Sequence, residues 1–287
     1  MSATPKTIQI FLPGGDPRGI RVAEITTRIV QVIEVPRKLL PEFFKLPESK
    51  QVALYFLVGE SEDEQQDQVY IGQTGDLKAR LSDHNKKKDF WQRALVLISR
   101  TNTLTQTHAL FLEWQSIQAA KEAGRYLVEN VNAGTKPHTP APMEAECMEV
   151  FETGQTLLAT LGYPVFDSLT AIKPKKQDLF YCKGRNSDAI MQYTEEGFVV
   201  LKGSKGRLKH VNSLDTSYAR LRKKFLETGV TVSDGDQVIY QKDHLFSSPS
   251  AAAAAVTGRP ENGWTAWKDS QGRTLDEVKR QSGGGSR

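Results

Sequence analysis

The chain has 287 residues, 38% hydrophobic and 25% charged, which is typical of a globular protein long enough for two domains. Its N-terminus lacks the pattern of a secretion signal, and no apolar run approaches the ~20 residues that span a bilayer, so we expect a soluble, cytoplasmic protein without a membrane partner. Cys147 and Cys182 lack CxxC spacing and neighbouring histidines, which predicts buried thiols rather than a zinc site or a disulfide.

The charge of the chain is unevenly distributed. The formal net charge is +4, but residues 170–230 hold 13 Lys and Arg against 6 Asp and Glu, a local +7 that leaves −3 elsewhere. Such asymmetry is expected of a region that binds a polyanion, and a solvated Lys-rich surface is the ordinary alternative.

The first half of the chain alternates strand-like and helix-like patterns. In chain order we expect β-structure at 6–11 and 19–34, a Pro-interrupted helical segment at 36–49, a strand at 51–60, an acidic loop, a strand at 69–72, a helix from Asp76 to about Lys88, a strand at 93–99, and helices near 106–123 and 143–161.

The second half changes to shorter elements. We expect short strands at 179–182 and 197–203, a basic helix at 218–228, a strand at 236–241, a helix at 247–258 that begins with Ser-Ser-Pro, and a Trp-rich strand at 262–269. The sequence therefore predicts an α+β fold class with a second, small α+β domain.

The helix that begins at Asp76 carries ionisable groups on an apolar face. Leu77, Arg80, Leu81 and His84 stand at i, i+3, i+4 and i+7, so periodicity places all four on the buried side. An unpaired buried guanidinium is costly because arginine does not lose its charge, so an anion is expected beside it.

The next long helix places a carboxylate in a similar position. Glu113 shares the stripe of Ala109 and Ile117. Either a buried Arg80–Glu113 salt bridge or a cleft in which a phosphate meets a divalent cation would explain the pattern. Two tyrosines, at positions 55 and 70, lie on the strands that lead into the first helix, where each taken singly fits an ordinary half-buried strand residue.

Together these residues resemble the GIY-YIG nuclease family. "ALY" at 53–55 stands where the family has its first motif, with Ala and Leu in place of Gly and Ile, and "YIG" at 70–72 is the second motif intact. The motif positions are filled, in chain order, by Tyr55, Tyr70, Arg80, His84, Glu113 and then either Asn130 or Asn132. The resemblance covers about residues 50–135.

The resemblance implies a fold, a reaction and a cofactor. It implies a small antiparallel sheet with flanking helices, and hydrolysis of DNA phosphodiester bonds with one Mg²⁺ or Mn²⁺ bound by Glu113. Arg80 would steady the scissile phosphate, Tyr55 and Tyr70 would position or deprotonate the attacking water, and His84 would orient it or relay a proton. The anion expected beside Arg80 is then a DNA phosphate.

The flanking segments also resemble a recurrent arrangement around such nucleases. The end of the chain, "FSSPSAAAAAVTGRPENGWTAWKD", resembles an uncharacterised domain often attached to them. We accordingly divide the chain into a β-rich extension at 1–48, a nuclease core with a trailing helix at 49–165, a basic α+β domain at 166–280 and a flexible tail at 281–287.

The basic domain is expected to bind double-stranded DNA. Arg220, Lys223 and Lys224 share one helix face at i, i+3 and i+4. The expected phosphate contacts are Lys202, Lys205, Arg207, Lys209, Arg220, Arg222, Lys223 and Lys224. Two alternatives to a DNA endonuclease stay open: a noncatalytic or regulatory DNA-binding protein on the same scaffold, and an enzyme that acts on RNA or single strands.

Overall fold

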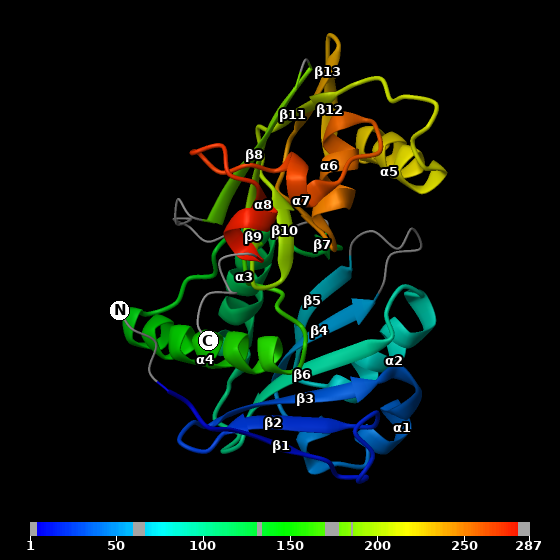
Figure 1. Cartoon of the computed structure of the whole chain (residues 1–287). Coiled ribbons are helices and arrows are strands. Elements are labelled where there is room, and N and C mark those ends of the chain that lie inside the picture. The colour runs from blue at the N-terminus through cyan, green and yellow to red at the C-terminus, as the bar shows by residue number, and fades with distance from the viewer. Residues whose placement is uncertain (1–4, 60–66, 131–133, 170–177, 185, 281–287) are drawn as a thin grey trace. The chain divides into compact units, whose positions relative to one another are not determined.

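A computed structural model describes residues 5–59, 67–130, 134–169, 178–184 and 186–280 of the chain (Figure 1). The chain forms two compact units, residues 1–168 and 169–287. Helices and strands occur in both, so the fold class is α+β, as the sequence predicts. The expected flexible tail, 281–287, lies outside the described residues.

The first unit is built on one sheet. Its strands are β1 (Ile8–Phe11), β2 (Arg21–Ile25), β3 (Val30–Pro36), β4 (Ala53–Gly59), β5 (Gln68–Thr74), β6 (Arg93–Ser99) and β7 (Leu127–Val128). Across the sheet they follow the order β1-β2-β3-β6-β4-β5-β7, with antiparallel neighbours except for the short parallel pair β5–β7.

The β-rich extension expected at 1–48 contributes β1, β2 and β3 to this sheet. Strand β3 pairs with β6 along its whole length, from Val30 opposite Ser99 to Pro36 opposite Arg93. Strand β3 is almost wholly buried, including the polar side chains of Gln31 and Glu34, because its side chains pack on both faces of the sheet.

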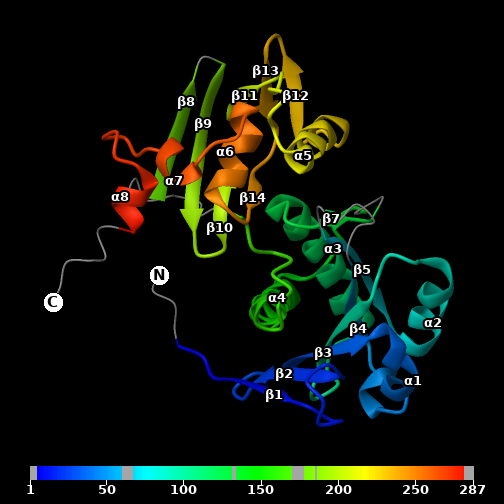
Figure 2. The same ribbon diagram turned by 45° about the vertical axis from the view of Figure 1, so that its right-hand side comes forward.

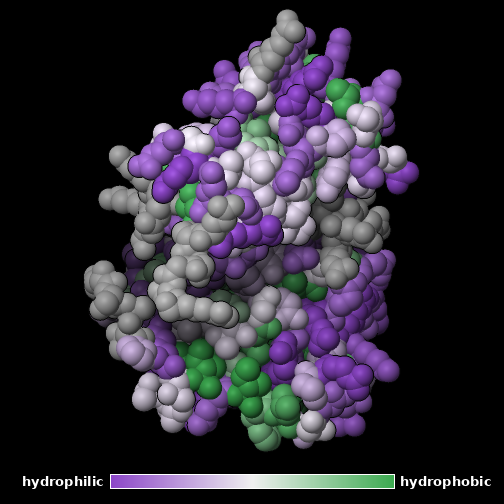
Figure 3. Space-filling view, in the orientation of Figure 1, coloured by the Kyte–Doolittle hydropathy of each residue, from purple (hydrophilic) through white to green (hydrophobic). Residues whose placement is uncertain are grey.

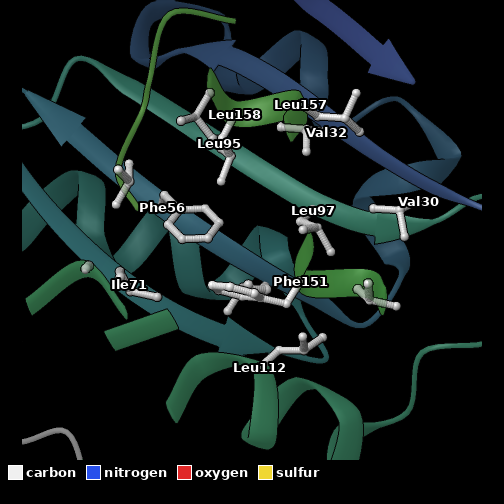
Figure 4. Packing of buried hydrophobic residues seen from close by; sticks show 14 of the residues in the cluster. Val30, Val32, Phe56, Ile71, Leu95, Leu97, Leu112, Phe151, Leu157 and Leu158 are labelled. Atoms are coloured by element: carbon white, nitrogen blue, oxygen red, sulfur yellow. The ribbon is translucent and has the colours of Figure 1, made fainter. Parts of the chain in front are cut away.

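Helices cover both faces of the sheet (Figures 1 and 2). They are α1 (Leu40–Phe43), α2 (Leu77–Lys87), α3 (Gln106–Ala123) and α4 (Ala141–Thr160), with 3-10 turns η1 (Arg37–Leu39) and η2 (Pro47–Lys50). In β4 the side chains alternate: Phe56 packs with α3 and α4, and Tyr55 and Leu57 pack with α1 and α2. Figure 4 shows the α4 side of this core, with Leu97 of the sheet beside Phe151.

The second unit has its own sheet and core. Its strands are β8 (Leu179–Gly184), β9 (Ser187–Thr194), β10 (Gly197–Val200), β11 (Lys205–Arg207), β12 (Thr231–Asp234), β13 (Gln237–Tyr240) and β14 (His244–Phe246). Their order is β12-β13-β11-β9-β10-β14, and β8 also pairs with β9. The helices are α5 (Thr216–Glu227), α6 (Pro249–Thr257), α7 (Gly263–Ala266) and α8 (Leu275–Lys279).

The alanine-rich helix α6 lies in the core of the second unit. It begins where the Ser-Ser-Pro sequence predicts, because the Ser248 side chain accepts a hydrogen bond from the backbone N–H of Ala251 at 3.1 Å. The prediction of a strand in the segment after α6 is wrong, because Asn262 caps the short helix α7 there. The buried side chain of Trp267 donates its indole N–H to the Pro249 carbonyl at 3.0 Å.

Two expectations from composition have clear outcomes. Cys147 and Cys182 are free and buried, as predicted, and burial raises the pKa of each thiol to about 11. Of the helices in the described ranges, none is long and apolar enough to cross a membrane.

Candidate functional site

The two motif tyrosines lie on neighbouring strands of the first unit, on the face that α2 covers. Tyr55 of β4 stands directly opposite Gly72 of β5, and Leu57 stands opposite Tyr70. A β-carbon added at Gly72 would overlap the Tyr55 hydroxyl and lie 2.5 Å from the ring carbon that bears it. The glycine of "YIG" therefore leaves the space in which the Tyr55 ring lies.

Helix α2 brings the next two residues to this face. It begins because the Asp76 carboxylate accepts a hydrogen bond from the backbone N–H of Ala79 at 2.9 Å. Leu77 and His84 are buried, as the periodicity predicts, but Arg80 is exposed rather than buried. Its long side chain runs along the edge of the helix face, so its charge stays at the border with solvent.

Three of the predicted residues, Tyr55, Arg80 and His84, meet at the Tyr55 hydroxyl, and Tyr70 joins them through Arg80. The Tyr55 hydroxyl lies 2.8 Å from Nε2 of His84 and accepts a hydrogen bond from Nε of Arg80 at 3.0 Å. Arg80 also donates to the Tyr70 hydroxyl at 3.4 Å, and the Tyr70 ring lies 4.9 Å from the His84 ring, centroid to centroid. The fold thus forms the continuous polar chain Tyr70–Arg80–Tyr55–His84.

The pKa shifts of this chain favour a neutral tyrosine and a neutral histidine. Burial raises the pKa of Tyr55 strongly, with Tyr70 adding to the shift and Arg80 opposing it. Burial, followed by the positive charges of Arg80 and Lys88, lowers the pKa of His84 to about 4. Near neutral pH the phenol can therefore donate its proton to Nε2 of an uncharged imidazole.

Glu113 reaches the site from the opposite side of the sheet. It lies on α3, which packs on the other face, and its carboxylate meets the backbone N–H of Gln73 at the edge of β5. Burial raises the pKa of Glu113, while Gln73 and the charge of Arg80 act in the opposite direction. Both residues are described, and no ion pair within 4 Å joins Arg80 to Glu113, so the salt bridge that was one of the two alternatives is absent there.

Of the two candidates for the last motif position, the structure describes only Asn130. The Asn130 side chain accepts a hydrogen bond from the Ile71 N–H at 2.9 Å and donates one to the Ile71 carbonyl at 2.8 Å. It thereby continues the pairing of β7 along β5 and holds the edge at which Glu113 lies. Asn132 lies outside the described residues.

The sequence analysis missed two contributions to this site. Gly72 has a packing role because it faces the Tyr55 ring, and a glycine inside a strand pattern is the signal for such a close approach. The backbone N–H of Gln73 orients Glu113, and no side-chain pattern indicates it, because any residue on an open strand edge offers the same donor.

The expected phosphate contacts of the second unit divide into surface and buried groups. The side chains of Lys202, Lys205, Lys209, Arg220 and Lys223 are exposed, and those of Arg207 and Lys224 are partly exposed. Figure 3 shows the visible face of this unit as mainly hydrophilic.

Arg222 does not fit the role of a phosphate contact. Its side chain is only 7% exposed and donates to the backbone carbonyls of Ala255, Arg207 and Leu208. Ala255 belongs to the last turn of α6, where unpaired carbonyl oxygens and the helix dipole favour a cation. Arg222 therefore stabilises the end of α6 inside the unit.

Comparison with known proteins characterises only the second unit. Residues 180–279 match DUF4357, a domain of unknown function. No curated protein and no solved structure matches the chain. The match leaves the residues from Tyr55 to Asn130 outside it, so the case for the first unit depends on the geometry of its own side chains.

Proposed function

We propose that this protein is a metal-dependent endonuclease that hydrolyses DNA phosphodiester bonds through a site of the GIY-YIG type. The observation that carries the proposal is the hydrogen-bonded chain of Arg80, Tyr55 and His84, with distances of 3.0 Å and 2.8 Å. A fixed cation, a phenol and a neutral imidazole in contact are the groups needed to hold a phosphate and move a proton beside it.

The geometry supports a specific path for the proton. As water attacks phosphorus and the bond to the leaving oxygen breaks, the Tyr55 oxygen takes a proton from the water while its own proton passes to Nε2 of His84, and the leaving oxygen takes a proton from solvent. A phosphate bound at Arg80 adds negative charge near His84, which raises the proton affinity of an imidazole whose pKa is otherwise lowered to about 4. Arg80, already oriented by Tyr55, stabilises the charge that develops on the phosphate oxygens.

Glu113 is the proposed metal ligand, and its surroundings fit this role. Its carboxylate is half-buried, and no Lys or Arg in the described ranges lies within ion-pair distance of it. Those ranges hold no cluster of three or more His, Cys, Asp or Glu, but Mg²⁺ often binds through one or two carboxylates plus substrate phosphate and water. When bound there, Mg²⁺ or Mn²⁺ would supply positive charge at the reacting phosphate.

The test of the proposal is cleavage by the full chain. Supercoiled, linear and single-stranded DNA and an RNA of the same sequence are incubated with Mg²⁺ or Mn²⁺, with and without EDTA. Glu113→Gln keeps the shape of the side chain and removes its charge, so cleavage should vanish while melting temperature is retained. Glu122→Gln makes the same change at an exposed position of α3 and should cleave normally.

The outcomes separate the alternatives. Metal-dependent cleavage that requires Glu113 supports the endonuclease, and the preferred substrate distinguishes duplex DNA from RNA or single strands. Tight DNA binding without cleavage under any metal condition would instead favour the noncatalytic DNA-binding protein. That alternative is supported by the basic second unit, where most of the expected phosphate contacts are exposed.

A further inference from the structure

Lys88 places a second cation at the candidate site. It follows the last residue of α2 and is partly buried, and its ammonium lies 4.4 Å from the centroid of the Tyr70 ring. The centroid of the Phe90 ring lies 6.0 Å from the same ammonium. Neither the family motif nor the helix periodicity singles out this residue.

The acidic residues near Lys88 in the sequence are held by other cations. Asp83 forms an ion pair with Lys87 at 2.8 Å, and Asp89 faces Arg37 at 3.9 Å. Within the described part of the chain, Lys88 has no carboxylate within 4 Å. The positive charge of a partly buried lysine without a counter-ion attracts an anion from outside the protein.

What holds Lys88 in place does not occupy its hydrogen-bond donors. The faces of two aromatic rings attract the ammonium through their quadrupoles, and the carbonyl end of α2 favours a cation at this position. Lysine carries three N–H donors. The side chain is therefore positioned before any ligand arrives, with donors available to one.

We propose that Lys88 forms a second phosphate-binding subsite, which takes a phosphate next to the scissile one on the same nucleic-acid strand. The inference rests on the proposed nuclease function. Arg80 meets the Tyr70 hydroxyl at 3.4 Å and Lys88 meets the ring of the same side chain at 4.4 Å, so the two cations bracket one tyrosine. Phosphates bound to both belong to one short stretch of backbone.

The field around His84 agrees with this placement. Burial lowers the pKa of His84, and the charges of Arg80, Lys88 and, more weakly, Lys87 lower it further, so Arg80 and Lys88 both lie near the imidazole. A strand that spans both subsites brings negative charge to each cation. Lys88 in this role is a binding residue, because it holds the strand at a phosphate next to the scissile one and does not touch the reacting atoms.

The first test compares Lys88→Gln with Lys87→Gln in the full chain. Both remove one positive charge, but Lys87 is an exposed residue already paired with Asp83. Lys88→Gln should raise KM for a cleavable oligonucleotide about tenfold, lower the slope of log KM against log salt by about one, and leave kcat nearly unchanged. Lys88→Arg should recover most of the affinity, and Lys87→Gln should behave as the wild type.

The second test locates the phosphate. Once the cleavage position is mapped, phosphates that flank it are replaced singly by neutral methylphosphonates. One replacement should weaken wild-type binding about as much as Lys88→Gln does and should cause no further loss in that variant. This non-additivity would not arise if Lys88 only stabilised the fold.

Each result has a definite meaning. The subsite is overturned if Lys88→Gln equals Lys87→Gln, or if every methylphosphonate weakens Lys88→Gln as much as it weakens the wild type. If Lys88→Gln fails to fold, Lys88→Met, which also removes the charge but keeps an unbranched apolar side chain, takes its place in the methylphosphonate series. If the wild type cleaves no nucleic acid, the proposed function fails and the subsite fails with it, an outcome distinct from normal cleavage with no role for Lys88.

Discussion

Removing one oxygen from Tyr55 is the sharpest perturbation of the site. Tyr55→Phe deletes a hydroxyl that contacts Nε2 of His84 at 2.8 Å and Nε of Arg80 at 3.0 Å. His84 is 5% exposed, so its ring nitrogen is left without a partner, which costs about 1–3 kcal/mol of the free energy of unfolding. For a unit of this size that corresponds to a melting temperature about 2–10 °C lower.

The expected loss of cleavage is far larger than this loss of stability. If the Tyr55 oxygen takes the proton of the attacking water, its removal should lower kcat by about 10²–10⁴, while affinity for DNA changes little. The assay is single-turnover cleavage at a temperature well below the melting transition of both proteins, with melting followed by calorimetry.

The control is the same change at another hydroxyl. Tyr163 donates its O–H to the buried carboxylate of Glu34 at 2.9 Å, away from the motif residues, so Tyr163→Phe should lower stability without affecting cleavage. Cleavage by Tyr55→Phe within a few fold of the wild type would refute the proton path, and equal losses in the two variants would reduce the effect to stability alone.

Three further predictions follow from the contacts. Gly72→Ala should lower both melting temperature and cleavage, because its new methyl group overlaps a tyrosine ring, whereas Gly14→Ala, with no atom within 4 Å of the added carbon, should do neither. The free energy of unfolding should fall by up to about 3 kcal/mol between pH 6.5 and about 4, because His84 takes up a proton in the unfolded chain but not in the folded site. Calorimetry of His84→Gln should show no such loss from this residue. Arg220→Gln should weaken DNA binding and its salt dependence without unfolding, whereas Arg222→Gln should lower the melting temperature of the second unit; equal melting of the two variants would contradict this division.

Periodicity predicted the buried line of α2 but not where each charge lies. Leu77, Leu81 and His84 are buried as their spacing requires. Arg80 shares that spacing and is exposed, because a side chain of its length carries the charge past the edge of the apolar stripe. The position of a residue on a helix face therefore predicts burial well for short side chains and poorly for long cationic ones.

The arrangement around Glu113 could not be predicted from local patterns. Its helix packs on the face of the sheet opposite α2. At the open edge of β5 the positive charge of Arg80 lowers the pKa of the Glu113 carboxylate, although the two groups form no ion pair. That edge exists because β7 pairs with only the first residues of β5, after which Asn130 takes over at Ile71. Strand order and the length of one short pairing are long-range properties, which alternation and capping signals do not encode.

Arg80 and Arg222 show why residue type and spacing do not by themselves distinguish a binding cation from a structural one. Each lies three residues from a buried apolar side chain of its own helix, Leu77 and Phe225. Arg222 donates from its two terminal nitrogens to three backbone carbonyls, and its Nε is buried inside the protein as well. Arg80 meets two phenol oxygens and remains exposed, so most of its five N–H donors can face an incoming anion. The distinction lies in the partners that the tertiary fold supplies, and for this reason we place the scissile phosphate at Arg80 and none at Arg222.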